Sequence, residues 1–177
     1  MNQRAEETWR GVPVRTLTRT DRGWLAKALR ATWGSIRVVS RGRLIEDVTR
    51  LPGFVAEAPT GRPIGFALLR FEEDDAEVVV LQSLEHGRGA GTALLDAARA
   101  DAADAGCRRV WLVTTNDNLH ALRFYQRRGW DWMAMHRDAV VESRRLKPEI
   151  SALGAHGIPI RHELEFELAL HAQASLR

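Results

Sequence analysis

The sequence has very little cysteine, tyrosine or lysine, and it has no long apolar run. Its 177 residues include one cysteine, one tyrosine and two lysines. A single cysteine excludes an intramolecular disulfide and a cysteine-based metal centre, so we expect Cys107 to be a buried, unreactive thiol. No apolar run exceeds four residues, whereas a membrane-spanning helix needs ~20. The first ten residues lack the apolar stretch of a secretory signal. These absences predict a cytoplasmic protein that neither crosses nor binds a membrane.

Charge and composition are those of an ordinary globular chain with a mild basic excess. The chain is 45% hydrophobic and 28% charged, with 26 basic against 23 acidic residues, and its length predicts a single domain over 1–177. Residues 1–50 hold 11 basic and five acidic side chains. Two interpretations remain open for this stretch: a solvated arginine-rich surface, or a surface for an acidic partner such as RNA.

Hydrophobic periodicity predicts a meander in the first half of the chain. In chain order we expect a strand over 12–18, a helix over 21–33 ended by Gly34, an irregular stretch over 34–53 with a short helix at 45–51, and strands at 54–57, 64–71 and 77–84. The last three strands are separated by short turns, so they should be antiparallel, because a parallel pair needs a longer crossover.

The second half alternates strands and helices. We expect a helix over 92–105, a strand over 109–114, a helix over 119–128, a strand over 130–136, a short helix over 138–146 and a strand over 161–170. The first strand–helix–strand unit should be parallel and right-handed. The last strand alternates cleanly, which predicts that Glu163, Glu165 and Glu167 face solvent. Pairing of this strand across a homodimer is a further hypothesis.

A glycine-rich turn joins the strand at 77–84 to the helix that follows. It reads His86-Gly87-Arg88-Gly89-Ala90-Gly91-Thr92. Such a turn exposes backbone N–H groups at the positive end of a helix dipole, which suits a pyrophosphate. The turn has no Lys for a P-loop, and Thr92 stands where a dinucleotide fingerprint needs its third glycine. A plain tight turn is the alternative interpretation.

A second motif begins after the strand at 109–114. Asn118 is placed to cap the next helix, and Tyr125 follows two turns later, on the same side. If strands 77–84 and 109–114 are parallel neighbours, both helix N-termini open at one sheet edge, where α/β proteins bind ligands. The alternatives are a cap with no further role for Asn118 and a half-buried packing residue for Tyr125.

Together these two motifs are similar to those of the GNAT superfamily of N-acetyltransferases. One is [Q/R]-x-x-G-x-[G/A], here His86-x-x-Gly89-x-Gly91, with His in place of Gln or Arg. The other is N-x-x-A-x-x-[FL]-Y-x-x-x-G-[FW], here running from Asn118 to Trp130. The resemblance covers about residues 76–137. It implies an α/β (mixed α+β) fold of three layers, in which helices flank a mixed, partly splayed sheet.

The resemblance also implies acetyl-CoA, or another acyl-CoA, between strands 77–84 and 109–114, with no metal. The implied binding residues are Val79, Val80, Leu81, His86, Gly87, Arg88, Gly89, Ala90, Gly91, Thr92, Asn118 and Tyr125. Tyr125 would protonate the leaving thiolate, a task that suits a phenol with a pKa of ~10. Backbone N–H donors would stabilise the oxyanion.

The base that takes the acceptor's proton is less well defined by the sequence. Glu77 is the first candidate, from its place on the central strand in some family members, and a solvated turn carboxylate is the alternative. His120, Glu163 and His86 are further candidates. Each also fits a simpler role: an exposed polar residue for His120 and Glu163, and a phosphate contact for His86.

The expected reaction is transfer of an acetyl group from acetyl-CoA to the primary amine of a small molecule by direct attack. The alternatives are a tRNA- or protein-directed acetyltransferase and a non-catalytic CoA-binding sensor. We expect the acceptor pocket to form from residues 33–43, the strand at 77–84 and the segment 138–161. Trp33 is a candidate for its lining, and Arg144 for a lid, although simple packing also accounts for the tryptophan.

Overall fold

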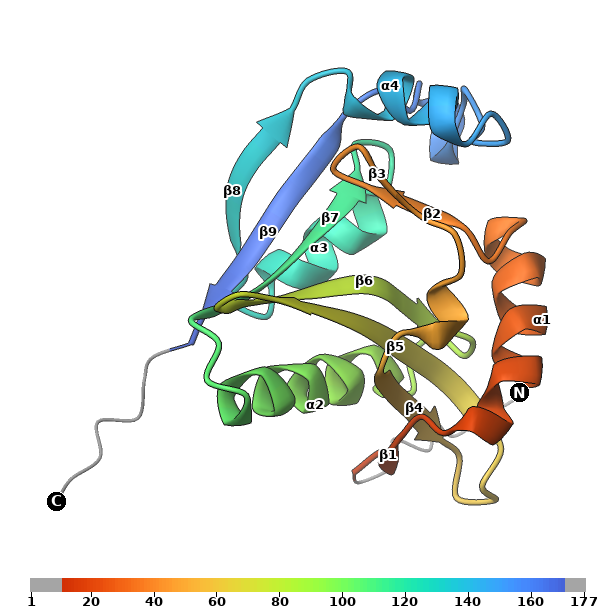
Figure 1. Ribbon diagram of the computed structural model, residues 1–177, viewed down its shortest axis with the longest axis vertical. Helices are drawn as coiled ribbons and strands as arrows, with labels where there is room; N and C mark the ends of the chain where they lie inside the picture. Colours follow the sequence, from red (N-terminus) through yellow and green to blue (C-terminus); the bar gives the residue numbers. More distant parts are fainter. Residues whose placement is uncertain (1–10, 171–177) are drawn as a thin grey trace, which may run out of the picture.

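The computed structural model describes residues 11–170, and every structural statement below concerns that part of the chain. Its main feature is a seven-stranded sheet in the order β1-β4-β5-β6-β7-β9-β8, beside a separate hairpin, β2-β3 (Figure 1). The strands are β1 (Val14–Thr16), β2 (Val38–Ser40), β3 (Arg43–Ile45), β4 (Gly53–Glu57), β5 (Pro63–Glu72), β6 (Asp75–Ser83), β7 (Arg109–Thr115), β8 (Asp131–His136) and β9 (Glu163–Ala169). The helices are α1 (Arg22–Trp33), α2 (Ala90–Asp104), α3 (Leu119–Gln126) and α4 (Ala139–Leu146), with single 3-10 turns η1 (Arg19–Asp21), η2 (Val48–Arg50) and η3 (Ala155–Gly157).

The centre of the sheet confirms the predicted connections. Strands β4, β5 and β6 form an antiparallel meander, and β6 pairs with β7 in parallel after the α2 crossover. The helix α2 begins at Ala90, two residues earlier than expected, so Gly91 and Thr92 belong to its first turn. Gly34 ends α1 in the left-handed conformation, as predicted.

Strands β6 and β7 separate soon after they meet. Their ladder runs from Asp75↔Arg109 to Glu77↔Trp111, although β6 continues to Ser83 and β7 to Thr115. Against β5, the register of β6 shifts so that Leu69 pairs with Val78 and Leu68 with Val80. Val79 is therefore the extra residue of a β-bulge, which bends a strand and increases its twist. The sheet is thus splayed between its two central strands.

Helices cover both faces of this sheet (Figure 1). Leu25 and Leu29 of α1 lie in one core cluster with Phe66 of β5. Leu95 of α2 lies in another with Leu69 of β5, on the opposite face. The resulting arrangement of helix, sheet and helix is the mixed α/β fold that the sequence predicts.

The prediction of an irregular stretch over 34–53 is wrong in one respect. Strands β2 and β3 form a hairpin there, and the short helix expected over 45–51 is reduced to the 3-10 turn η2. Arg41 and Gly42 connect the strands with φ of 47° and 72°, as a type I′ turn requires.

The prediction that the glutamates of the last strand face solvent is also wrong for Glu163 and Glu165. Glu163 and Glu165 are only 4% and 5% exposed, because Arg41 of the hairpin lies against both of them. Strand β9 has β7 on one side and β8 on the other, so it has no free edge to pair across a dimer.

Two simpler expectations can be compared with the structure. Cys107 is buried and unpaired, and burial raises the pKa of its thiol. Across residues 11–170, none of the helices has the length and apolar character required to cross a membrane.

Candidate active site

A cleft opens beyond the point where β6 and β7 separate. It has a volume of about 640 Å³ and is bordered by the C-terminal end of β6, the glycine turn, the start of α2 and one side of α3. The residues predicted from the sequence that line it are Leu81, His86, Gly87, Gly89, Ala90, Gly91, Thr92, Asn118 and Tyr125. The structure therefore brings most of the two motifs together at one sheet edge.

The glycine turn has a backbone that side chains would disfavour. Gly87 and Gly89 have φ of 76° and 84°, in the left-handed region. Gly89 is the N-cap of α2, and no side chain caps this helix end. The first N–H groups of α2 consequently lie at the cleft without a side-chain acceptor, which is the arrangement that binds anions at helix ends.

Gly91 allows α2 and α3 to approach each other closely. A Cβ at this position would lie 3.0 Å from Cζ of Phe124, closer than carbon atoms pack. Arg128, just after α3, stacks over the Phe124 ring at 3.6 Å and donates to Oγ1 of Thr92 at 2.6 and 2.9 Å. A guanidinium thus lies beside the first turn of α2. The sequence analysis missed Arg128, because its contact with Thr92 spans 36 residues and leaves no local pattern.

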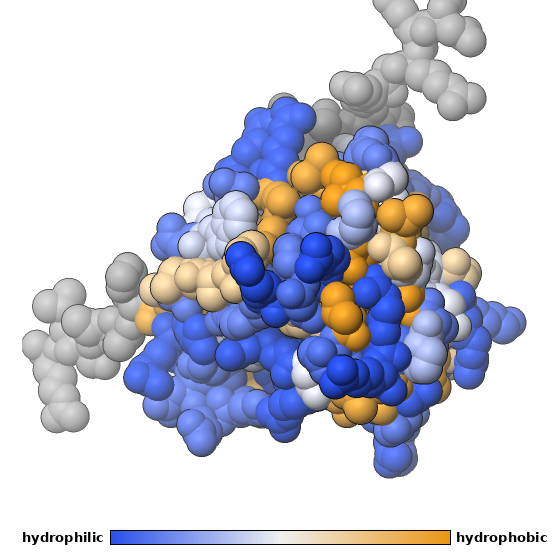
Figure 2. Space-filling view, turned by 90° about the horizontal axis from the view of Figure 1, so that it is seen from above, coloured by the Kyte–Doolittle hydropathy of each residue, from blue (hydrophilic) through white to orange (hydrophobic). Residues whose placement is uncertain are grey.

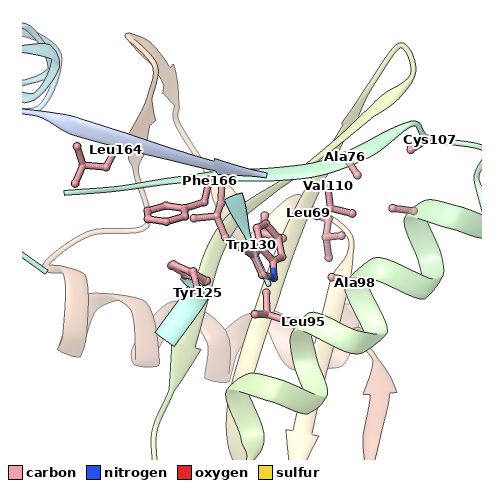
Figure 3. Close-up of a cluster of buried hydrophobic side chains, with 13 residues drawn as sticks. Leu69, Ala76, Leu95, Ala98, Cys107, Val110, Tyr125, Trp130, Leu164 and Phe166 are labelled. Carbon is pink, nitrogen blue, oxygen red and sulfur yellow. The ribbon is translucent and has the colours of Figure 1, made fainter. Parts of the chain in front are cut away.

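Asn118 caps α3, as predicted. Its Oδ1 accepts from the N–H of Ala121 at 3.1 Å, and Asn118 also lines the cleft. Tyr125, two helical turns later, is 8% exposed and packs among Phe124, Trp130 and Phe166, with ring centroids 5.3 to 5.7 Å apart. Figure 3 shows Tyr125 beside Phe166 and Trp130 in this cluster. Burial raises the pKa of the phenol, so Tyr125 remains protonated at neutral pH.

Four of the predicted residues do not line this cleft. Val79 and Val80 pack on the α1 side, so their side chains point away from the cleft. Arg88 lies 4.0 Å from Glu85. Glu77 is 2% exposed and accepts hydrogen bonds from Ser40 and Arg70. The cleft is also lined by Trp33, the residue predicted for the acceptor pocket, and by His120, a predicted candidate for the base. Its other lining residues include Gln82, Ser83, Ala121 and Phe124.

Two of the histidines, His86 and His120, lie together at the cleft. The rings of His86 and His120 are 6.0 Å apart, and His120 stacks on Phe124 at 6.4 Å. This position, beside the glycine turn and Arg128, fits a contact with phosphate better than a base at the other end of the splay. Trp33, from the end of α1, reaches the same cleft and donates to Oε1 of Gln82 at 3.1 Å.

The turn between β7 and α3 holds the long segment that follows α4. Oδ1 of Asn116 accepts from the N–H groups of Arg161 and His162, and its Nδ2 donates to the carbonyl of Pro159, all at 2.9 Å. Oδ2 of Asp117 accepts from the N–H of Ala155 at 3.1 Å. Arg144 closes the segment from α4, through carbonyls of Ile150, Ser151 and Ile160. The segment predicted to form a lid is therefore held by the turn after β7 and by Arg144 of α4.

Hydrogen bonds also tie α4 to the segment before β2. Nζ of Lys147 donates to the carbonyl of Arg37 at 2.8 Å, and Arg37 donates to the carbonyl of Leu146 at 3.3 Å. Figure 2 looks down on the end of the molecule where α4 lies and shows a largely hydrophilic face with small hydrophobic groups near its middle. The hairpin covers this end of the splay through Ser40 and Arg41, and α4 packs against β2 of the hairpin.

The basic residues of the first 50 positions are matched only in part within the fold. Arg15 bonds Asp21 and Glu57, Arg37 pairs with Glu46, and Arg43 pairs with Glu72. Residues 1–10 lie outside the described chain. Within the described part, Arg19, Arg22, Lys27, Arg30 and Arg50 form no salt bridge and are exposed to solvent.

Comparisons with known proteins agree with this geometry. The model of the Acetyltransferase (GNAT) family matches residues 23–130. The Bacillus subtilis protein YdhI is 42% identical over 135 residues, which are 76% of this chain and 83% of that protein. The chain therefore belongs to the GNAT acetyltransferase family.

Solved structures show the same fold at low sequence identity. A Bacillus subtilis acetyltransferase in complex with CoA has a TM-score of 0.65 and 18% identity, covering 91% of this chain and 100% of that one. A GNAT family acetyltransferase from Elizabethkingia anophelis with acetyl-CoA bound has a TM-score of 0.64 and 15% identity, covering 92% and 100%.

Proposed function

We propose that this chain transfers an acetyl group from acetyl-CoA to the primary amine of a small-molecule acceptor. The observation that carries the proposal is the cleft at the splay, where the glycine turn, Asn118 and Tyr125 meet. Membership of the GNAT family supports the reaction class. The sites named below are proposals of the same kind.

The cleft offers the cofactor three kinds of contact. The N–H groups at the start of α2, with Gly87 and Gly89, would hold the pyrophosphate, and Arg128 would add a positive charge. The edge of β6 beyond Glu77 has no ladder partner on the β7 side. Backbone groups of Val79, Val80 and Leu81 on that edge would therefore bind the pantetheine arm as an added strand would.

Tyr125 is the proposed acid. Its raised pKa keeps the proton on the phenol until a thiolate forms nearby. A backbone N–H on the unpaired part of β6 would stabilise the oxyanion of the tetrahedral intermediate. A proton donor retained in the cleft argues for an enzyme over a CoA sensor.

The cover over the other end of the splay favours a small acceptor. The bonds from Lys147 and Arg37 keep α4 against the segment before β2. A tRNA or a folded protein would need an open surface there, whereas a small amine needs only a narrow entry.

The test is a thermal-shift titration with acetyl-CoA, with CoA and ATP alongside. Acetyl-CoA at ~100-fold above its dissociation constant should stabilise the fold by ~2.7 kcal/mol, a shift of several degrees, and ATP should not. A shift with ATP alone, or none with acetyl-CoA at millimolar concentration, would contradict the proposal. Release of free thiol with a panel of amines then measures transfer.

A further inference from the structure

Two buried carboxylates lie on either side of the β2–β3 hairpin tip. Oγ of Ser40 donates to Glu77 on β6, and the N–H of the next residue, Arg41, donates to Oε2 of Glu163 on β9 at 3.1 Å. Two consecutive residues of the hairpin therefore bridge strands that lie on opposite sides of β7. Glu77 is also the last residue of β6 that pairs with β7, so the hairpin tip lies over the point where the splay begins.

The two carboxylates differ in their charge partners. Glu77 forms a salt bridge with Arg70, whose side chain is itself 15% exposed. Among the described residues, Glu163 has no salt bridge. Its neighbours His136 and Arg41 pair with Glu165 instead, at 2.7 and 3.6 Å. Glu163 thus accepts one backbone hydrogen bond and has no neutralising partner of its own.

Glu163 and Tyr125 lie on opposite faces of the sheet. Tyr125 packs against Phe166 of β9, and side chains alternate along a strand, so Glu163 and Glu165 face the other way. The hairpin lies on the glutamate side. A thioester held in the splay would then have its sulfur toward Tyr125, and an amine could approach its carbonyl from the side of Glu163.

We propose that Glu163, rather than Glu77, receives the proton of the acceptor's ammonium group. The acceptor is then a cationic primary amine, which replaces the Arg41 N–H as the hydrogen-bond partner of this carboxylate. This inference rests on the proposed acetyl transfer and adds to it the base and the charge of the substrate.

The proton and electron balance of the reaction closes with these residues. The ammonium group gives one proton to Glu163, which later releases it to solvent. The nitrogen lone pair forms the N–C bond, and the C–S bond breaks with its electron pair on sulfur. Tyr125 gives its proton to that sulfur, and the second proton lost by the nitrogen as the amide forms returns to the phenolate.

The environment of Glu163 supports a basic carboxylate. Burial, the largest influence, raises its pKa, and the nearby Glu77 acts in the same direction. The Arg41 N–H, and the charges of His136 and Arg41, act in the opposite direction. The net pKa is raised, so the group holds a proton more firmly than an exposed glutamate does.

Glu163→Gln is the sharpest variant, because the amide oxygen still accepts from the Arg41 N–H but cannot take a proton. With spermidine, tyramine and glutamate as probes, the wild type should acetylate the first two far better than glutamate. E163Q should lower kcat/KM about 100-fold at pH 7, as expected for loss of a general base. Activity of E163Q should recover as the pH approaches the amine's own pKa. The acetyl-CoA thermal shift should not change.

Glu77→Gln and Glu165→Gln are matched controls on the same face. The inference predicts that each retains the wild-type pH profile, even if the fold is less stable. The inference would be overturned if E163Q kept the wild-type pH profile of activity, or if only E77Q lost that profile. Turnover of glutamate alone among the three probes would also overturn it. Binding of acetyl-CoA without turnover of any probe would overturn the substrate class. Absence of an acetyl-CoA shift in the wild type would instead refute the proposed function itself.

Discussion

The two sides of the splay are built in different ways. The proposed cofactor side consists mainly of two local turns, each followed by the helix that it starts, and apart from Trp33 its lining lies within residues 81–128. The proposed acceptor side is assembled from the hairpin at 38–45 and, more than 100 residues later in the chain, from the segment after α4 and β9. Local backbone geometry can be seen in a sequence, whereas a surface made by distant pairings cannot.

Tyr125→Phe should break the cofactor side chemically and leave its structure intact. Loss of the acid should lower kcat about 100-fold or more, because the thiolate must then take its proton from water. The ring contacts with Phe166 and Trp130 remain, so the melting temperature and the acetyl-CoA shift should stay near wild type. Steady-state thiol release measures the first, and calorimetry the second. An unchanged kcat would remove Tyr125 from the mechanism.

Gly91→Ala should break the cofactor side structurally. The added Cβ meets the Phe124 ring at 3.0 Å, so the ring, or the helix that carries it, must shift, at a cost of ~1–3 kcal/mol. Acetyl-CoA should bind more weakly as a result. Gly23→Ala in α1 is the matched control, since nothing lies within 4 Å of its Cβ, and it should stabilise the fold by ~0.5–1 kcal/mol. Urea unfolding of both variants checks the contrast, and equal effects would contradict it.

Arg128→Ala should weaken the binding of acetyl-CoA and leave the acceptor side unchanged. It removes a charge beside the first turn of α2, and a charge-assisted hydrogen bond is worth ~1.5–3 kcal/mol. The KM for acetyl-CoA should rise about tenfold or more, while the KM for the amine stays the same. Arg128→Lys should restore part of the affinity. A rise confined to the amine's KM would place Arg128 on the wrong side of the splay.

Asn116→Ala should weaken the acceptor side by a smaller amount. It removes three hydrogen bonds to residues 159–162, each worth ~1 kcal/mol at most in a partly exposed site. The KM for the amine should rise several-fold and the acetyl-CoA shift should persist. Hydrogen exchange in the segment 147–162 should become faster. Protection that does not change would show that Arg144 holds the segment without Asn116.

The contrast between the two sides also explains what the sequence could predict. The meander, the parallel pair and both site helices follow from periodicity and from glycine positions, so the cleft could be located before the structure was known. The hairpin was missed because Ser40-Arg41-Gly42-Arg43 has arginine at a left-handed position, where asparagine, aspartate or glycine is usual. The sequence signal for this hairpin would have been the pairing of Val38 with Ile45 across the turn.

Burial of Glu163 could not be predicted from alternation alone. Alternation separates the two faces of a strand and says nothing about what covers each face. The cover comes from Arg41, 122 residues earlier in the chain. Arg128 was missed for the same reason, since its partner Thr92 is distant in sequence.

The bulge at Val79 determines which face of β6 the side chains after it occupy. Ala76 and Val78 share one core cluster with α2, and Leu81 packs on that side too, so even and odd positions exchange faces at this residue. Glu77 and Leu81 both have odd numbers, yet one meets the hairpin and the other lines the cleft. A strand of the same sequence that paired Val79 in the ladder, without the bulge, would alternate strictly and turn Leu81 toward α1. Because of this one extra residue, β6 presents Glu77 to the hairpin and Leu81 to the cleft, although the two residues are four positions apart.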